Sequence, residues 1–98
     1  MAVYTLGVWT VKPGHEDEFV SAWTEMGNAT MQAFPGATGT LLRDRDVPGR
    51  FISFGPWESM EQVEQWRGSP AFRDGVARIR ATLDGFEPHT MDEVLTVR

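Results

Sequence analysis

Residues 56–83, PWESMEQVEQWRGSPAFRDGVARIRATL, contain the pattern on which the fold of this chain depends. Ser59 stands three residues before Gln62, which is the spacing of a capping box. In that motif the serine hydroxyl and the glutamine side chain each bind a backbone amide that the first turn of a helix leaves without a partner. A helix is therefore predicted to begin after Ser59, and Gly68 is predicted to end it.

A second helix is predicted to begin at Ser69, with Pro70 in its first turn, where the missing N–H of proline costs no hydrogen bond. It is predicted to run to Leu83, because Gly85 lies just past that point. Apolar residues recur at helical spacing on one face of each helix. They are Met60, Val63 and Trp66 in the first helix and Phe72, Val76, Ile79 and Leu83 in the second. Two such helices, preceded by Trp57, are predicted to form a wall over a sheet.

Five further segments are predicted to supply that sheet and a third helix. Residues 2–12 are rich in β-branched and aromatic residues and predict a strand. Both of its faces are largely apolar, so each of them must be covered. Residues 16–34 predict an amphipathic helix of about five turns, residues 38–46 and 51–57 a hairpin, and residues 91–97 the last strand. This order predicts an α+β protein with an antiparallel sheet, on the split βαβ plan of the ferredoxin-like fold.

The composition limits the classes of function. Ninety-eight residues are too few for two hydrophobic cores, so residues 1–98 are predicted to form a single domain. The net charge of −5 argues against a nucleic-acid partner, because phosphate binding needs a basic surface. The absence of cysteine excludes disulfides and thiolate chemistry. No run is long enough to span a membrane and the N-terminus lacks signal-peptide features, so a cytoplasmic protein without a membrane partner is predicted.

Four segments together resemble the antibiotic biosynthesis monooxygenase family. They are the opening VWTVKPGHEDEFVSAW, the hairpin arm PGATGTLLRDRD, the strand that ends in PWES, and the corner QWRGSPAF. The resemblance implies a homodimer called a dimeric α+β barrel, in which the sheets of two subunits pack face to face and the helices lie outside. Such a dimer would explain why the first strand is apolar on both faces.

The heme-degrading branch of this family can be compared with this sequence at three positions. That branch has an asparagine on the first strand, a tryptophan before the helix corner and an iron-binding histidine after it. The corresponding positions here are Gly7, Trp66 and Val76, so only the tryptophan is present. Valine cannot bind a metal. Heme degradation is therefore rejected, and no cofactor is predicted.

The cofactor-independent branch implies an apolar pocket between the sheet and the helices. In that branch the protein deprotonates an acidic aromatic substrate, stabilises its anion and excludes water, and the substrate carbanion reacts with dioxygen. The substrate would be a small aromatic, polyketide or quinone-like molecule. Thr5 and Gly7 would leave room for a flat ring. The candidate wall residues are Trp9, Trp23, Phe51, Trp57, Trp66, Phe72 and Val76.

Three residues are the candidates for a catalytic role. Trp66 stands at the helix corner, where the family places a side chain in the cavity. His89 is the candidate base, and Arg73 the candidate holder of an anion, together with Arg78 and Arg80. His15 is interpreted as an exposed residue at a helix start, so the two histidines form no recognisable metal site.

A second interpretation is a dimeric module of the same fold that binds a small ligand, or acts in a stress response, without catalysis. The lack of an identifiable base favours it. Tryptophans are also large and mostly buried in any protein, so core or interface packing explains them as well as a substrate pocket does.

Overall fold

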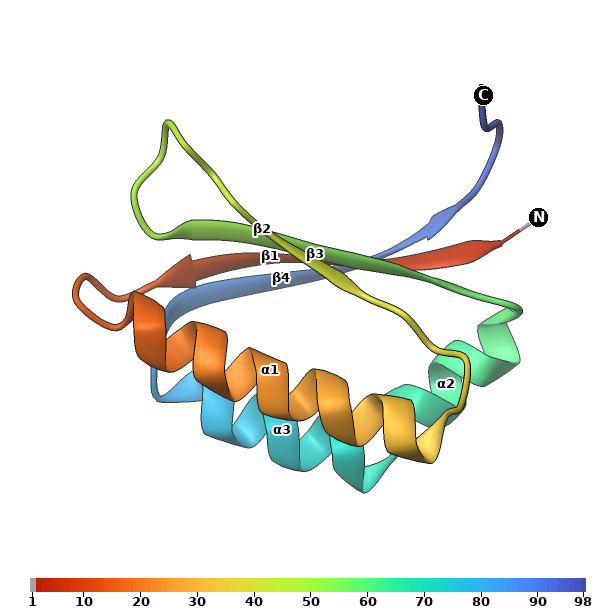
Figure 1. The fold of residues 1–98 in the computed structure, drawn as a ribbon, viewed down its shortest axis with the longest axis horizontal. Helices are drawn as coiled ribbons and strands as arrows, with labels where there is room; N and C mark the ends of the chain where they lie inside the picture. Colours follow the sequence, from red (N-terminus) through yellow and green to blue (C-terminus); the bar gives the residue numbers. More distant parts are fainter. Residues whose placement is uncertain (1) are drawn as a thin grey trace.

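The computed structural model describes residues 2–98, in which three helices cover one face of a four-stranded antiparallel sheet (Figure 1). The strands follow the order β2-β3-β1-β4. In the sheet β3 lies between β1 and β2, and β1 lies between β3 and β4, which is the split βαβ arrangement. The predicted ferredoxin-like α+β fold is therefore confirmed. The elements are β1 (Val3–Val11), α1 (Glu16–Ala33), β2 (Thr40–Arg43), β3 (Arg50–Trp57), α2 (Met60–Arg67), α3 (Pro70–Arg80) and β4 (Leu83–Asp92).

The two helix starts lie where the sequence predicts them. The Ser59 hydroxyl accepts a hydrogen bond from the Gln62 amide at 3.2 Å, and the Ser69 hydroxyl accepts one from the Phe72 amide at 3.4 Å. The Gln62 side chain differs from a strict capping box, because it accepts from the amide of Glu58 at 3.0 Å. One more free amide before the helix is thereby satisfied.

The last strand was predicted wrongly. Helix α3 ends at Arg80, so Leu83 begins β4 and is no part of a helix face. Strand β4 pairs with β1 along most of its length, and residues after Asp92 form no regular element. Gly85 and Pro88 lower the β-propensity of this segment. The edge position tolerates the proline, which pairs with Gly7, and tertiary pairing therefore prevails over local propensity.

Alternation along β1 separates a covered face from an uncovered one. Thr5, Gly7, Trp9 and Val11 are buried beneath the helices, whereas Tyr4, Leu6 and Val8 are half-buried and Thr10 is exposed. No helix of the described chain lies over that second face (Figure 1). Apolar residues of the neighbouring strands extend the same face, because their register aligns them with β1. They are Leu42, Ile52, Phe54 and Met91.

The core lies between the covered face of the sheet and helices α1 and α3. Phe19 of α1 and Ile79 of α3 are fully buried, and both belong to the cluster that contains Trp9. Helices α1 and α3 lie side by side across the sheet (Figure 1). Gly75 permits this approach, because a Cβ atom there would lie 2.7 Å from Cβ of Met26. Within residues 2–98, no helix is long and apolar enough to cross a membrane.

Replacing Gly75 by alanine is therefore expected to lower the free energy of unfolding by about 1–3 kcal/mol, because the new methyl group overpacks the contact with Met26. Gly27→Ala is the matched control on α1. A Cβ at Gly27 meets only the Trp23 ring, at 3.8 Å, so this change should stabilise the chain by about 0.5–1 kcal/mol. Urea unfolding of both variants measures the difference. Equal behaviour of the two would contradict close packing at Gly75.

Candidate functional site

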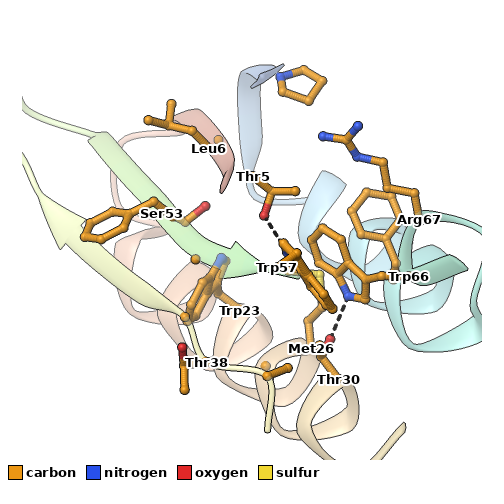
Figure 2. A pocket seen from close by; sticks show the side chains of 18 of the residues that line it. Thr5, Leu6, Trp23, Met26, Thr30, Thr38, Ser53, Trp57, Trp66 and Arg67 are labelled. Atoms are coloured by element: carbon orange, nitrogen blue, oxygen red, sulfur yellow. Dashed lines mark hydrogen bonds between the residues drawn. The ribbon is translucent and has the colours of Figure 1, made fainter. Parts of the chain in front are cut away.

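A cavity of about 200 Å³ lies between the covered face of the sheet and the helices (Figure 2). Strands β1 and β3 supply its floor, and helix α1 and residues 37–39 supply one wall. The end of α2, the start of α3 and residues of β4 close the opposite side. The cavity is smaller than the roughly 300–1,000 Å³ of sites for drug-sized ligands, so it suits a small ligand.

A second hollow of about 410 Å³ lies beyond Trp57, beside the turn that follows α1. It is lined mainly by the turn after α1 and by the end of β3, with Pro35, Gly36 and Pro56 among its residues. Only one aromatic ring and few side-chain polar groups face it. The smaller cavity is the stronger candidate, because aromatic and hydroxyl side chains converge there.

Three pairs of side chains, each a tryptophan bonded to a hydroxyl, organise the cavity. In each of them an indole N–H donates to a serine or threonine hydroxyl, and all six residues line the cavity. The pairs are Trp9 with Ser53 at 2.9 Å, Trp57 with Thr5 at 3.1 Å and Trp66 with Thr30 at 3.0 Å. These bonds set the orientation of the rings, because a buried indole N–H without a partner is costly.

Gly7 makes room for the first of these pairs. A Cβ atom on Gly7 would lie 2.9 Å from Nε1 of Trp9 and 3.0 Å from Oγ of Ser53. The glycine is therefore explained by close packing over the Trp9–Ser53 hydrogen bond, as well as by its position on the cavity wall.

The rings at the α2–α3 corner pack against one another. The centroids of Trp57 and Trp66 are 5.0 Å apart, and those of Trp66 and Phe72 are 4.6 Å apart in an edge-to-face arrangement. Ser69 contributes by donating its hydroxyl proton to the Trp66 carbonyl oxygen at 2.6 Å. The Gly-Ser-Pro corner thus positions one aromatic side of the cavity.

Trp23 differs from the other tryptophans. Its ring lines the cavity, yet its Nε1 atom is shielded from water and has no hydrogen-bond partner within residues 2–98. The ring lies near two glycines, with a Cβ on Gly39 meeting it at 3.5 Å and one on Gly27 at 3.8 Å. A buried donor without an acceptor is uncommon in proteins. No hydrogen bond within the described chain fixes the orientation of the Trp23 ring.

Arg67 is the only ionisable residue among those that line the cavity. It is the last residue of α2 and is half-buried, and its guanidinium donates to the His89 carbonyl oxygen at 3.4 Å. Sequence reasoning missed this residue, because Arg67 looks like an ordinary basic residue at a helix C-terminus. Only the pairing of β4 beside β1 shows that this side chain faces a cavity.

The predicted site residues divide into two groups. Those that line the cavity are Thr5, Gly7, Trp9, Trp23, Trp57, Trp66 and Phe72. Phe51 and Val76 belong to the buried core and do not line the cavity. Arg73 is exposed on α3, outside the lining, and Arg78 pairs with Glu25 at 2.8 Å.

His89 lies away from the cavity as well. It pairs with Leu6 in the sheet, so its side chain belongs to the uncovered face, where its Nε2 atom lies 3.5 Å from a carboxylate oxygen of Glu87. The structure therefore offers no geometric support for His89 as a base in this cavity. It also brings His15 nowhere near it, and residues 2–98 contain no cluster of three groups suited to a metal ion.

The carboxyl groups with perturbed pKa values lie outside the cavity. The pKa of Asp44 is lowered chiefly by the hydrogen bond from the Asp46 amide, and also by Arg50. The pKa of Glu93 is lowered chiefly by the Thr96 hydroxyl. Both groups are structural, because they hold a turn and the segment after β4.

The structure is an α+β fold whose cavity is built from aromatic rings and hydroxyls. The family model for antibiotic biosynthesis monooxygenases matches residues 2–78, and the chain belongs to that family. The resemblance read from the sequence is thereby confirmed. A comparison with curated proteins finds no match.

Several solved structures share the fold. SnoaB, a cofactor-independent oxygenase from Streptomyces nogalater, has a TM-score of 0.83 and 25% identity over 98% of this chain and 96% of that chain. A Caulobacter crescentus protein has a TM-score of 0.83 and 21% identity, over 96% and 91% of the two chains. A Mycobacterium tuberculosis protein has a TM-score of 0.84 and 17% identity over 100% of both. The last two likenesses concern the fold alone.

The Trp66–Thr30 bond can be tested by a double-mutant cycle. Thr30→Val and Trp66→Phe are expected to show a coupling of about 1 kcal/mol in unfolding free energy, because either change removes the same hydrogen bond. Thr24→Val is the matched control, since the Thr24 hydroxyl donates to the Val20 carbonyl oxygen of its own helix. Its cycle with Trp66→Phe should give no coupling. A Thr30 coupling below about 0.3 kcal/mol would contradict the pair.

Proposed function

We propose that the chain is a cofactor-independent monooxygenase that acts on a small aromatic, polyketide or quinone-like substrate in this cavity. Membership of the family and the likeness to SnoaB support the class of reaction. The observation that carries the proposal is the cavity itself. Its wall is aromatic and apolar, and its buried polar side chains are neutral hydroxyls and indoles.

The proposed reaction needs little from the protein. An anthrone-type substrate loses a proton to give a carbanion, which transfers one electron to dioxygen, and the two radicals combine to a peroxide. Loss of water then leaves a quinone, so that one dioxygen supplies one oxygen atom to the product and one to water. Thr5, Ser53 and Thr30 would orient the substrate oxygens, and Trp66 and Phe72 would pack on its ring and exclude water.

A second candidate function is ligand binding without catalysis. The observation that favours it is the absence of any carboxylate or histidine from the cavity lining. Without a base, catalysis is restricted to substrates that ionise readily in water. A ligand that raised the melting temperature saturably without turnover would support this function.

Oxygen uptake is the decisive measurement for the enzymatic proposal. The purified protein is expected to show substrate-dependent oxygen uptake with at least one of a set of anthrones, hydroquinones and flavonols, and with an anthrone it should consume one dioxygen for each quinone formed. Gly27→Leu should abolish this turnover, because the new side chain enters the cavity from α1. Ala77→Leu, on the exposed side of α3, is the matched control and should retain it.

No substrate-dependent uptake across the whole set would contradict the oxygenase. Uptake that survives in the well-folded Gly27→Leu variant would contradict this cavity as its site. Melting temperatures of both variants establish that they fold.

We also propose that the chain is a homodimer in which the uncovered sheet faces of two copies pack together. The apolar residues of that face support this, since an uncovered apolar sheet face of this extent is unusual in a monomer. Light scattering at micromolar concentration should give twice the 11.0 kDa mass of the chain. Ile52→Glu should reduce it to a monomer, because a buried unpaired charge is costly, whereas Ala77→Glu on α3 should not. A wild-type monomer would contradict the proposal.

A further inference from the structure

We infer that Arg67 binds an oxygen anion carried by the aromatic ligand, so that the cavity selects ionised aromatic ligands over their neutral counterparts. This inference rests on the proposed function only in taking the same cavity as the ligand site. It identifies the chemical class of the ligand and the residue that determines the selection.

The position of Arg67 is the first argument. Figure 2 shows its side chain extending from α2 past Trp66 at the edge of the cavity. Arg67 lines that cavity together with Phe72, Phe86 and Pro88. The guanidinium therefore belongs to the edge of a cavity whose wall carries aromatic surface on which a flat ring can pack.

The lack of an ionic partner is the second argument. Among residues 2–98, no carboxylate lies within 4.0 Å of the Arg67 guanidinium. On its own helix Glu64 precedes it by three residues without forming an ion pair, and on β4 the side chain of His89 contacts Glu87 instead. Within the described chain, the guanidinium of Arg67 makes one hydrogen bond, the long one to the His89 carbonyl oxygen. Four of its five N–H donors remain for a ligand.

A structural role at the helix end is the alternative explanation. Basic residues in the last turn of a helix interact favourably with its carbonyl oxygens. The hydrogen bond of the Arg67 guanidinium, however, goes to the backbone of β4 and not to that of α2. The side chain thus extends from the helix to the strand along the cavity edge. A capping side chain would instead turn back to the carbonyl oxygens at the end of its own helix.

The buried hydroxyls are the third argument. Thr5, Ser53 and Thr30 each accept an indole N–H, and no residue of the described chain accepts their own hydroxyl protons. Each of them can therefore donate a proton to a ligand oxygen. Together with Arg67 they offer a ligand several donors and no negative charge. Such a site favours an oxyanion, because its donors and its positive charge stabilise the ionised form of an enol or phenol.

Two ligands with the same ring system separate charge from shape. They are 2-hydroxy-1,4-naphthoquinone, which is an anion at neutral pH, and its neutral methyl ether, 2-methoxy-1,4-naphthoquinone. Calorimetric titration of the wild-type protein is expected to show about tenfold or greater preference for the anion, the usual size for a charge-assisted hydrogen bond. Arg67→Gln should remove that preference and leave the affinity for the methyl ether unchanged. Arg67→Lys should retain part of it, because lysine keeps the charge without the planar fork.

Arg73→Gln is the matched control, because Arg73 is exposed on α3 and lies outside the cavity lining. It should keep the full wild-type preference. Equal affinity of the wild type for both ligands would overturn the inference, and so would a preference that persists in Arg67→Gln or disappears in Arg73→Gln. Failure of the oxygenase proposal is a separate result, since the binding preference requires no turnover and oxygen uptake requires no naphthoquinone.

Discussion

The hydrogen bond from the Trp9 indole to the Ser53 hydroxyl is the interaction on which the rest of the structure depends. It links the covered faces of β1 and β3 and requires the adjacent Gly7 to lack a side chain. The Trp9 ring stacks on Phe86 at 4.0 Å, which ties β4 to the sheet, and contacts Phe19 of α1 at 5.6 Å. One polar bond therefore positions the floor of the cavity, one of its strands and the helix above it.

The cavity repeats the same solution at each of its other tryptophan–hydroxyl pairs. An indole supplies a large apolar surface, and a hydroxyl satisfies its one donor without adding a charge to the interior. The result is a site that is apolar, rigid and free of groups that titrate near neutral pH. Such a site suits a reaction in which the substrate itself provides the reactive electrons. It suits ordinary acid–base catalysis poorly, because no side chain is placed to move a proton.

The charged group of the site comes from a different part of the molecule. Arg67 ends a helix that begins at a well-formed cap, and its side chain lines the cavity and donates to the backbone of β4. Strand β1 is apolar on both faces. One face lines the cavity and the core, and the other faces away from all three helices (Figure 1). Ligand binding and subunit contact would thus use opposite faces of one strand.

The sequence by itself determined the elements that local chemistry specifies. Ser59, Ser69 and Pro70 signal helix starts through the backbone groups they satisfy, and alternation along residues 2–12 identifies the first strand. These signals, in their order, sufficed for the ferredoxin-like plan. The family and most of the aromatic cavity wall came from the resemblance of four segments to a known family. The sequence predicted a last strand but placed it too late, because Gly85 and Pro88 suppress the local signal of β4 and pairing with β1 creates it.

The remaining features depend on contacts between distant segments, which only the tertiary structure decides. Phe51 and Val76 carry the apolar pattern of a cavity wall but pack into the core instead. The side chain of His89 lies on the far face because strand register, which local sequence does not specify here, sets its direction. Arg67 belongs to α2, and its place at the cavity edge beside β4 likewise follows from contacts between distant segments. A residue's chemistry can be read from the sequence, but the surface on which it acts follows from strand pairing and from the packing of the helices.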